Sequence, residues 1–249
     1  MNEQIKLQCS CLDKLSLAIQ QNYIPPIQSI LLKNEGEGPV EGLKVSISFE
    51  PHFAADFTAD IDRIDPGTPV EISPVNIVVL PDFMFSLTER LTAVMHISVS
   101  AGEVLCSEDR QIELLPVSEW CGVSVLPELT AAFVTPAHPA LAGVISNASQ
   151  HLAGWCGDPS FTEYQTHNPN NAKLQAAAIF AALQQENITY VMAPPGFEST
   201  GQKVRTADVV LSTKQANCLD MTLLYCSCLE AVGLRPMICV IEGHAFAAV

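Results

Sequence analysis

Short runs in which hydrophobic and polar residues alternate fill the first 120 residues of the chain. A period of two places every second side chain on one face of a strand, and the residues between the runs are rich in Gly, Pro, Asn and Asp. Seven or eight such strands predict an antiparallel β-sandwich of the immunoglobulin-like type. The runs are residues 5–11, 15–19, 25–32, 43–49, 75–80, 91–100, the stretch from 104 onward and 111–115.

Two segments of this region do not fit the strand pattern. One helical turn is predicted near Pro81. The acidic stretch 55–65 is predicted to be a solvated loop. It lacks the Gly and Glu placement of a calcium-binding hand loop, so a cation site is the weaker alternative.

After about residue 120 the spacing of apolar residues becomes helical. Apolar residues from Leu174 to Ala182 recur three and four positions apart, which describes one face of a helix over 171–186. The second region, 121–249, is therefore predicted to be an α+β domain that follows the sandwich of 1–120. Its other predicted elements are helices at 126–134, 139–152 and 218–232, strands at 190–193, 237–241 and 243–249, and a loop at 194–205.

The charge also changes near residue 120. Residues 1–120 carry 18 acidic and 7 basic side chains, whereas 121–249 carry 9 and 5, within a net charge of −15. A hydrophobic fraction of 48% excludes a disordered chain. No apolar run approaches the roughly 18 residues of a membrane span, and no basic stripe follows the chain. We therefore expect no membrane insertion and no nucleic-acid binding by these 249 residues.

Nine cysteines, an odd number at irregular spacings, and a start without a signal-peptide pattern predict reduced thiols in the cytoplasm. Cys9 and Cys11 form a C-x-C pair on a predicted strand, so both point to one face. Cys226 and Cys228 form a second pair on a predicted helix, where residues two apart diverge. Neither pair has the spacing of a zinc ribbon. We expect buried thiols and no metal or organic cofactor, with a structural metal as the alternative.

A cysteine and a histidine are placed for thiol chemistry in the second region. Cys218 lies where a polar approach meets the apolar helix 218–232, and the positive end of a helix dipole favours the nucleophilic thiolate. His244 follows on a predicted strand after a glycine. A strand that a short loop joins to this helix can pack beside it, which is the minimum arrangement for nucleophilic catalysis by a thiol. Coincidental placement of one Cys and one His is the alternative.

The residues around this pair resemble a known family. Gln215-Ala-Asn-Cys-Leu-Asp-Met through Gly233-Leu-Arg-Pro236, followed by Ile241-Glu-Gly-His-Ala-Phe246, is similar to the core of the transglutaminase-like superfamily of papain-like thiol enzymes. In that family a cysteine opens a helix, and a Gly-His-Ala-aromatic strand supplies the histidine. A longer resemblance, from Gln202 through His244 together with the strand-rich first region, is to the N-terminal part of large bacterial proteins. In those proteins a superfamily-one DNA helicase and often a nuclease domain follow.

The resemblance implies roles for individual residues. Cys218 matches the nucleophile and His244 the base that activates it, in acyl transfer on a peptide or amide by a protease, deamidase or transglutaminase-like enzyme. The family has a third member, usually Asp, on the next strand, and it holds the imidazole in orientation. We expect that acid to lie beyond Val249, in a domain that this chain cuts short. Ala216 stands where the family commonly has Gly.

Three further polar residues are candidates near this pair. Gln202 is a candidate oxyanion donor, because an amide near a thiol nucleophile suits that task, with a loop glutamine as the alternative. Arg205 is a candidate for binding a substrate carboxylate, or it forms a structural ion pair. Asp220 is interpreted as an acid that favours the helix dipole, and not as the third catalytic member.

A function of another class fits the same features. The chain can be a non-catalytic interaction module that keeps the thiol-domain fold, since a first region of net charge −11 suits a protein partner better than DNA. The intact Cys218 and His244 favour the enzyme. With either function the expected partner is a protein or peptide, and helicase or nuclease domains are expected downstream.

Overall fold

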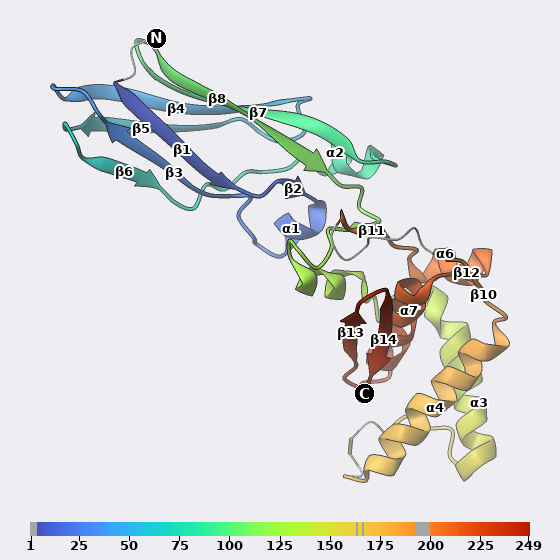
Figure 1. Cartoon of the computed structure of the whole chain (residues 1–249). Coiled ribbons are helices and arrows are strands. Elements are labelled where there is room, and N and C mark those ends of the chain that lie inside the picture. The colour runs from blue at the N-terminus through green and yellow to red at the C-terminus, as the bar shows by residue number, and fades with distance from the viewer. Residues whose placement is uncertain (1–3, 163, 166, 193–199) are drawn as a thin grey trace. The chain divides into compact units, whose positions relative to one another are not determined.

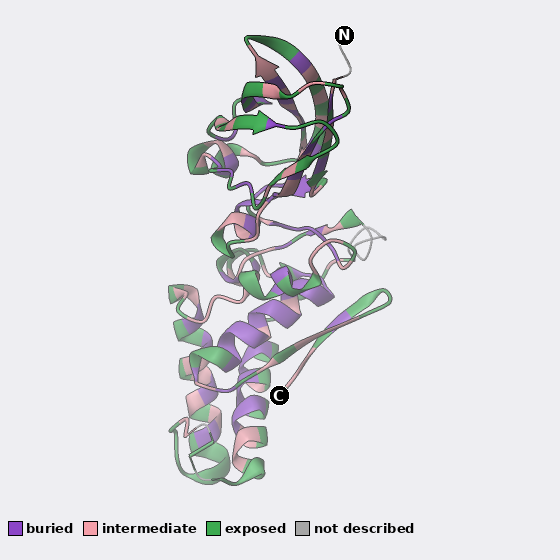
Figure 2. Cartoon of the chain, turned by 90° about the vertical axis from the view of Figure 1, so that its left-hand side faces the viewer, coloured by how far each residue is buried: buried purple, intermediate pink, exposed green. Residues whose placement is uncertain are grey.

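The computed structural model describes residues 4–162, 164–165, 167–192 and 200–249. They form two compact units, Met1–Glu119 and Trp120–Val249 (Figure 1). The division falls where the hydrophobic pattern and the charge of the sequence change. Buried residues gather between the strands of the first unit and along the helices of the second (Figure 2).

Two sheets make up the first unit. Three strands form an antiparallel sheet in the order β1-β3-β6, and five strands form a second sheet in the order β2-β8-β7-β4-β5. Within the second sheet only β2 is parallel to its neighbour. The strands are β1 (Ile5–Cys11), β2 (Lys14–Leu15), β3 (Ile27–Asn34), β4 (Val40–Glu50), β5 (Phe57–Ile64), β6 (Pro69–Ile72), β7 (Leu91–Ala101) and β8 (Glu103–Leu114).

Alternation along the strands produces the core of the first unit. In β4, Leu43, Val45 and Ile47 are at most 1% exposed, while the residues between them are exposed or half-buried. The same pattern on β7 buries Met95 and Val99. Burial of each such side chain stabilises the fold by about 1.5–3 kcal/mol before the entropy cost is subtracted. The predicted strands at 5–11, 25–32, 43–49 and 91–100 and the one from 104 onward are confirmed, whereas 111–114 continues β8 and is not a separate strand.

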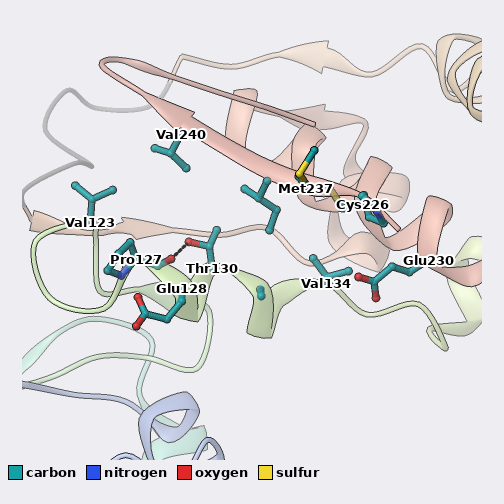
Figure 3. Close-up of a pocket in the computed structure, with 12 residues that line it drawn as sticks. Val123, Pro127, Glu128, Thr130, Val134, Cys226, Glu230, Met237 and Val240 are labelled. Atoms are coloured by element: carbon teal, nitrogen blue, oxygen red, sulfur yellow. Dashed lines mark hydrogen bonds between the residues drawn. The ribbon is translucent and has the colours of Figure 1, made fainter. Parts of the chain in front are cut away.

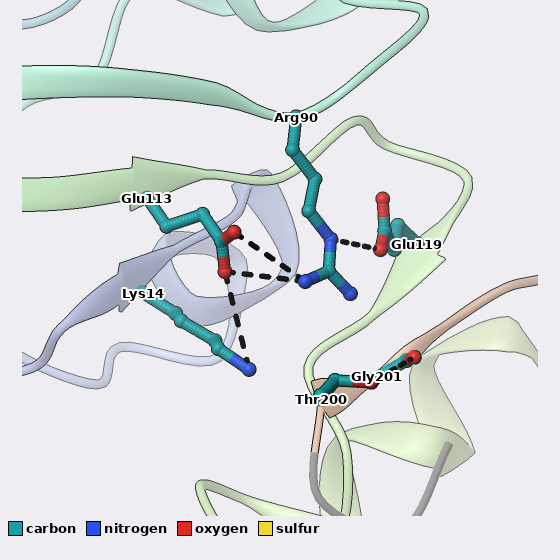
Figure 4. A network of polar contacts seen from close by, with 6 residues as sticks. All are labelled: Lys14, Arg90, Glu113, Glu119, Thr200 and Gly201. Carbon is teal, nitrogen blue, oxygen red and sulfur yellow. Dashed lines mark hydrogen bonds and ion pairs between the residues drawn. The ribbon is translucent and has the colours of Figure 1, made fainter. Parts of the chain in front are cut away.

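An ion-pair network closes one end of the first unit (Figure 4). The Arg90 guanidinium donates a hydrogen bond to Glu119, whose side chain is only 4% exposed, and lies 3.4 Å from Glu113. Lys14 on β2 is 4.0 Å from the same Glu113. A buried carboxylate is stable only when a cation or hydrogen bonds replace its water. Arg90 supplies that replacement for Glu119.

Three sequence predictions in the first unit are wrong. Residues 15–19 do not form one strand: Lys14–Leu15 is β2, and Leu17–Gln21 is the short helix α1, which Ser16 caps by accepting from the Ile19 amide. Residues 75–80 make only isolated bridges. Most of the acidic stretch 55–65 is the strand β5 and not a loop. The predicted helical turn near Pro81 is confirmed as α2 (Pro81–Ser86).

Helices dominate the second unit. Apolar faces of α3, α4 and α7 pack into one core that contains Ile179, Leu183 and Leu229. No helix in the described residues is both long and apolar enough to cross a membrane. The described helices are η1 (Pro127–Phe133), η2 (Pro139–Leu141), α3 (Ala142–Cys156), α4 (Pro169–Gln185), α6 (Ala207–Thr213) and α7 (Cys218–Ala231), and the described strands are β9 (Glu119–Trp120), β10 (Thr189–Tyr190), β11 (Gln202–Lys203), β12 (Gln215–Ala216), β13 (Met237–Ile241) and β14 (His244–Ala248).

The hairpin of β13 and β14 packs against α7. Gly243 forms its turn with φ +69°, a conformation that side chains disfavour. The predicted strand at 237–241 is confirmed as β13. The burial that its apolar run predicted is wrong, because Met237 is 61% and Ile241 is 54% exposed. Residues 193–199, within and beside the predicted loop, lie outside the described residues.

Candidate thiol site

Cys218 is the first residue of the most buried helix of the second unit. Asn217 caps α7 by accepting a hydrogen bond from the Asp220 amide at 3.0 Å, and Asp220 accepts one from the Asn217 amide at 3.0 Å. This reciprocal capping box fixes where the helix begins. The helix N-terminus, where backbone N–H groups lack intrahelical partners, is therefore held at the Cys218 position. The sequence predicted this start, and the structure confirms it.

Asp220 has a structural role. Its side chain is fully buried, and besides the Asn217 amide it accepts the Arg205 amide at 2.8 Å and the Arg205 guanidinium at 2.9 Å. These bonds tie the segment that carries Arg205 to the start of α7. Arg205 thus forms the ion pair that was the alternative to substrate binding, and the Asp220 carboxylate is occupied.

Cys218 and His244 line the same cavity, which we call the Cys218 pocket. His244 is the first residue of β14, directly after the Gly243 turn, and β14 packs on α7. Cys218 is 8% exposed, whereas His244 is exposed and its ring stacks on Phe246 with centroids 6.4 Å apart. No hydrogen bond joins the two side chains among the described residues. The structure therefore brings the predicted pair to one pocket without a direct contact.

The Cys218 pocket has a volume of about 590 Å³, which is within the range of small-molecule and peptide side-chain sites. Its described lining is apolar, aromatic or neutral polar, and includes no Asp, Glu, Lys or Arg. The lining residues are Phe180, Leu183, Gln184, Asn187, Ile188, Tyr190, Cys218, Met221, Thr222, Tyr225, His244, Ala245, Phe246 and Ala247.

Tyr190 is a member of this site that the sequence reading missed. It ends β10 and lines the Cys218 pocket, with its hydroxyl close to Cys218. The proximity of Cys218 raises the pKa of Tyr190, mainly through charge repulsion between the two ionised forms. Tyr190 is therefore a neutral donor at neutral pH. Tyr190 opens the predicted strand at 190–193, and that run carries no signal for this proximity, because Cys218 lies 28 positions further along the chain.

Gln202, the predicted oxyanion donor, lies outside the Cys218 pocket. It lies on β11 and is 7% exposed, and neither its Nε2 nor its Oε1 has a hydrogen-bond partner among the described residues. Buried amides are rarely left in this state. Gln202 is three residues from Arg205, which binds the start of α7, but it does not line the Cys218 pocket.

A second pocket in this unit, of about 560 Å³, lacks an activated nucleophile (Figure 3). Cys226 is its only cysteine, and its thiol is fully buried. Burial, with the nearby Glu230 and Cys239, raises the pKa of Cys226 to about 12. Since the thiolate is the reactive form, Cys226 is inert at neutral pH.

The cysteines of the C-x-C pairs form no metal site in the described part of the chain. No group of three or more His, Cys, Asp or Glu side chains is placed there to hold an ion. Burial raises the pKa of Cys228 to about 12, as it does for Cys226. Both behave as small apolar side chains in the core of the second unit.

Comparisons with known proteins do not assign the chain to a family. No family model and no curated protein matches it. Among solved structures, the alkylpurine DNA glycosylase AlkC of Pseudomonas fluorescens, bound to DNA containing an abasic site analog, is similar with a TM-score of 0.29 and 17% identity. The similarity covers 45% of this chain and 30% of the glycosylase chain. A similarity this limited supports no argument about fold or function.

Proposed function

We propose that the protein carries out cysteine-dependent acyl transfer on a peptide or amide substrate. One observation carries the proposal: Cys218, the first residue of α7, and His244, the first residue of β14, line one pocket. The same proposal includes membership of the transglutaminase-like superfamily for the second unit and an immunoglobulin-like fold for the first. It also includes a position N-terminal to a DNA helicase in a larger protein, and a cytoplasmic location.

In the proposed mechanism the Cys218 thiolate attacks the substrate carbonyl carbon, and the carbonyl π electrons move to oxygen. His244 holds the proton that left the thiol and delivers it to the leaving amine when the C–N bond breaks. A thioester remains on Cys218 until water or a second amine attacks it. Backbone N–H groups at the start of α7 are the proposed oxyanion donors. Gln202 is a further candidate, supported by its buried amide, which has no hydrogen-bond partner among the described residues.

Relative thiol reactivity tests the proposal without a known substrate. Iodoacetamide labelling of the whole chain at several pH values, read by mass spectrometry, should modify Cys218 faster than N-acetylcysteine at neutral pH. It should also modify Cys218 faster than Cys156, although Cys156 is exposed and Cys218 is 8% exposed. A Cys218 rate no greater than that of N-acetylcysteine contradicts the proposal.

Two variants identify the partner of the thiol. His244→Ala should slow Cys218 labelling at neutral pH by at least about tenfold, because the proton acceptor is gone. His151→Ala, on α3, is the matched control and should leave the rate unchanged. Equal rates in all three proteins would remove His244 from the mechanism.

The interaction module is the second candidate function. The described lining of the Cys218 pocket includes no carboxylate, and the β13–β14 hairpin exposes Met237, Ile241 and Phe246. Exposed apolar side chains of this kind are typical of protein-binding surfaces. A slow Cys218, together with partner binding that Ile241→Asp abolishes, would support this function over catalysis.

A further inference from the structure

Two cysteines of the first unit share one face of an edge strand. Cys9 and Cys11 lie on β1, and β1 has one neighbour, β3, in its sheet. Cys9 is 7% exposed and Cys11, at the end of the strand, is half-buried. Cys9 lies close enough to Cys11 for a hydrogen bond between the thiols to alter the pKa of both. The two side chains are therefore neighbours on one face of β1.

The backbone is compatible with a bond between these sulfurs. Residues two apart on a strand are separated by about 6.6 Å along it, at the upper end of the roughly 4.4–6.8 Å found between bridged Cα atoms. The ladder with β3 is irregular here: Ser10 pairs with Ser29, whereas Cys11 pairs with Ile27. A bridge at the limit of the favoured geometry is easily reduced, which is typical of reversible disulfides.

The surroundings make the two thiols unequal. The hydrogen bond from Cys9 lowers the pKa of Cys11 to about 7, burial opposes this, and the Arg110 guanidinium assists it. The same hydrogen bond, with burial, raises the pKa of Cys9. Glu108 and Asp13 act against the Cys11 thiolate, and Glu108 is itself 2.6 Å from Arg110. An attacking thiol works best when its pKa is near the ambient pH, and Cys11 meets this condition.

We propose that Cys9 and Cys11 are a redox-active dithiol that low-molecular-weight disulfides such as glutathione disulfide convert to an intrastrand disulfide. The Cys11 thiolate attacks one sulfur of glutathione disulfide, the S–S bond breaks, and one glutathione thiolate leaves and takes up a proton. Cys9 then loses its proton and attacks the Cys11 sulfur, which expels the second glutathione. Two cysteine thiols are oxidised, and one glutathione disulfide is reduced to two glutathione molecules.

Trypsin gives a direct assay on the whole chain. Cleavage after Lys6 and Lys14 releases peptide 7–14, which contains Cys9 and Cys11 and no other cysteine. Cleavage after Arg90 and Arg110 releases peptide 91–110, whose only cysteine is Cys106. After treatment with glutathione disulfide at pH 7.5, removal of the reagent, unfolding in urea and labelling with iodoacetamide, peptide 7–14 should carry no label and be two hydrogens lighter than its reduced form. Cys106, whose pKa burial raises, should remain fully labelled as the matched control.

Variants separate the two steps. Cys9→Ala should stop the reaction at a stable Cys11–glutathione adduct, and Cys11→Ala should leave Cys9 unmodified. Circular dichroism should show native β-structure for both variants. Two labels on the wild-type peptide after treatment, or a stable glutathione adduct on wild-type Cys11, would overturn the proposal. The wild-type labelling result tests the proposal by itself, even if a variant fails to fold.

Discussion

The hydroxyl of Tyr190 lies close to Cys218 in the same pocket, so this residue is placed to affect thiol reactivity as a hydrogen-bond donor. A donor to sulfur favours the thiolate over the thiol. Tyr190→Phe should therefore slow the labelling of Cys218 by iodoacetamide at neutral pH by about three- to tenfold. Tyr225→Phe is the matched control, because that hydroxyl donates to the Ala176 carbonyl and should leave Cys218 unaffected. A faster reaction in Tyr190→Phe would show that Tyr190 shields the thiol instead of activating it.

Gly201 determines where Gln202 lies. Its φ is +87°, and an added Cβ would be 2.3 Å from the Trp120 carbonyl oxygen. Gly201→Ala should therefore lower the free energy of unfolding of the second unit by at least about 2 kcal/mol, measured by urea denaturation. Gly154→Ala in α3 is the control, since a Cβ there meets open space, and it should raise stability by about 0.5–1 kcal/mol. Equal stability of Gly201→Ala and wild type would refute this account of β11.

At the scale of elements, a cross-strand pair gives the first unit a pH response. His96 on β7 pairs with Asp109 on β8, with His96 Nδ1 2.7 Å from Asp109 Oδ1, and Glu50 lies 3.7 Å from Nε2. The hydrogen bond to Asp109 raises the pKa of His96 above 6.5. Because the folded value is raised, the stabilising effect is complete below pH 6.5 and is lost as the pH rises through the folded pKa.

NMR titration of the imidazole tests this pair. The His96 midpoint should lie above 6.5 in the wild type and move toward 6.5 in Asp109→Asn. Asp60→Asn on β5, where Asp60 pairs with Lys44, should leave the midpoint unchanged. A wild-type midpoint at or below 6.5 would mean that the His96–Asp109 bond is absent in solution.

Elements with strong periodicity could be predicted from the sequence, and those set by tertiary context could not. Strand β4 follows from alternation alone, and α4 from its spacing of three and four. Helix α1 was not predicted because Leu17 and Ile19 alternate as in a strand, and only the Ser16 cap indicated a helix. The alternating Phe57, Ala59 and Ile61 did mark β5, but its acidic residues suggested a loop.

The residues of the candidate site also differ in whether the sequence could predict them. Cys218 and His244 could be found because the start of α7 and the turn at Gly243 have local sequence signals. Tyr190 could not, since only packing brings β10 to α7. The burial of the Gln202 amide depends equally on three-dimensional surroundings that no local pattern encodes.

At the scale of the whole molecule, each unit has its own core. The first unit buries Ile30, Val45 and Met95 between its sheets, and the second buries Ile179 and Leu229 among its helices. A unit with a closed core of this kind, above about 100 residues, is large enough to fold independently. The division at Glu119 and Trp120 therefore predicts two cooperative folding units.

A fragment of residues 1–119 should consequently fold by itself. It keeps Glu119, the buried partner of Arg90, together with the Lys14 and Glu113 side chains of the same ion-pair network. Urea unfolding should be a single cooperative transition, and the His96 midpoint should equal that of the full chain. A fragment of residues 1–117 is the matched control: it loses Glu119, and with it the buried ion pair of Arg90, and should unfold at lower urea concentration. Failure of the 1–119 fragment to unfold cooperatively would mean that the first unit needs the second for its stability.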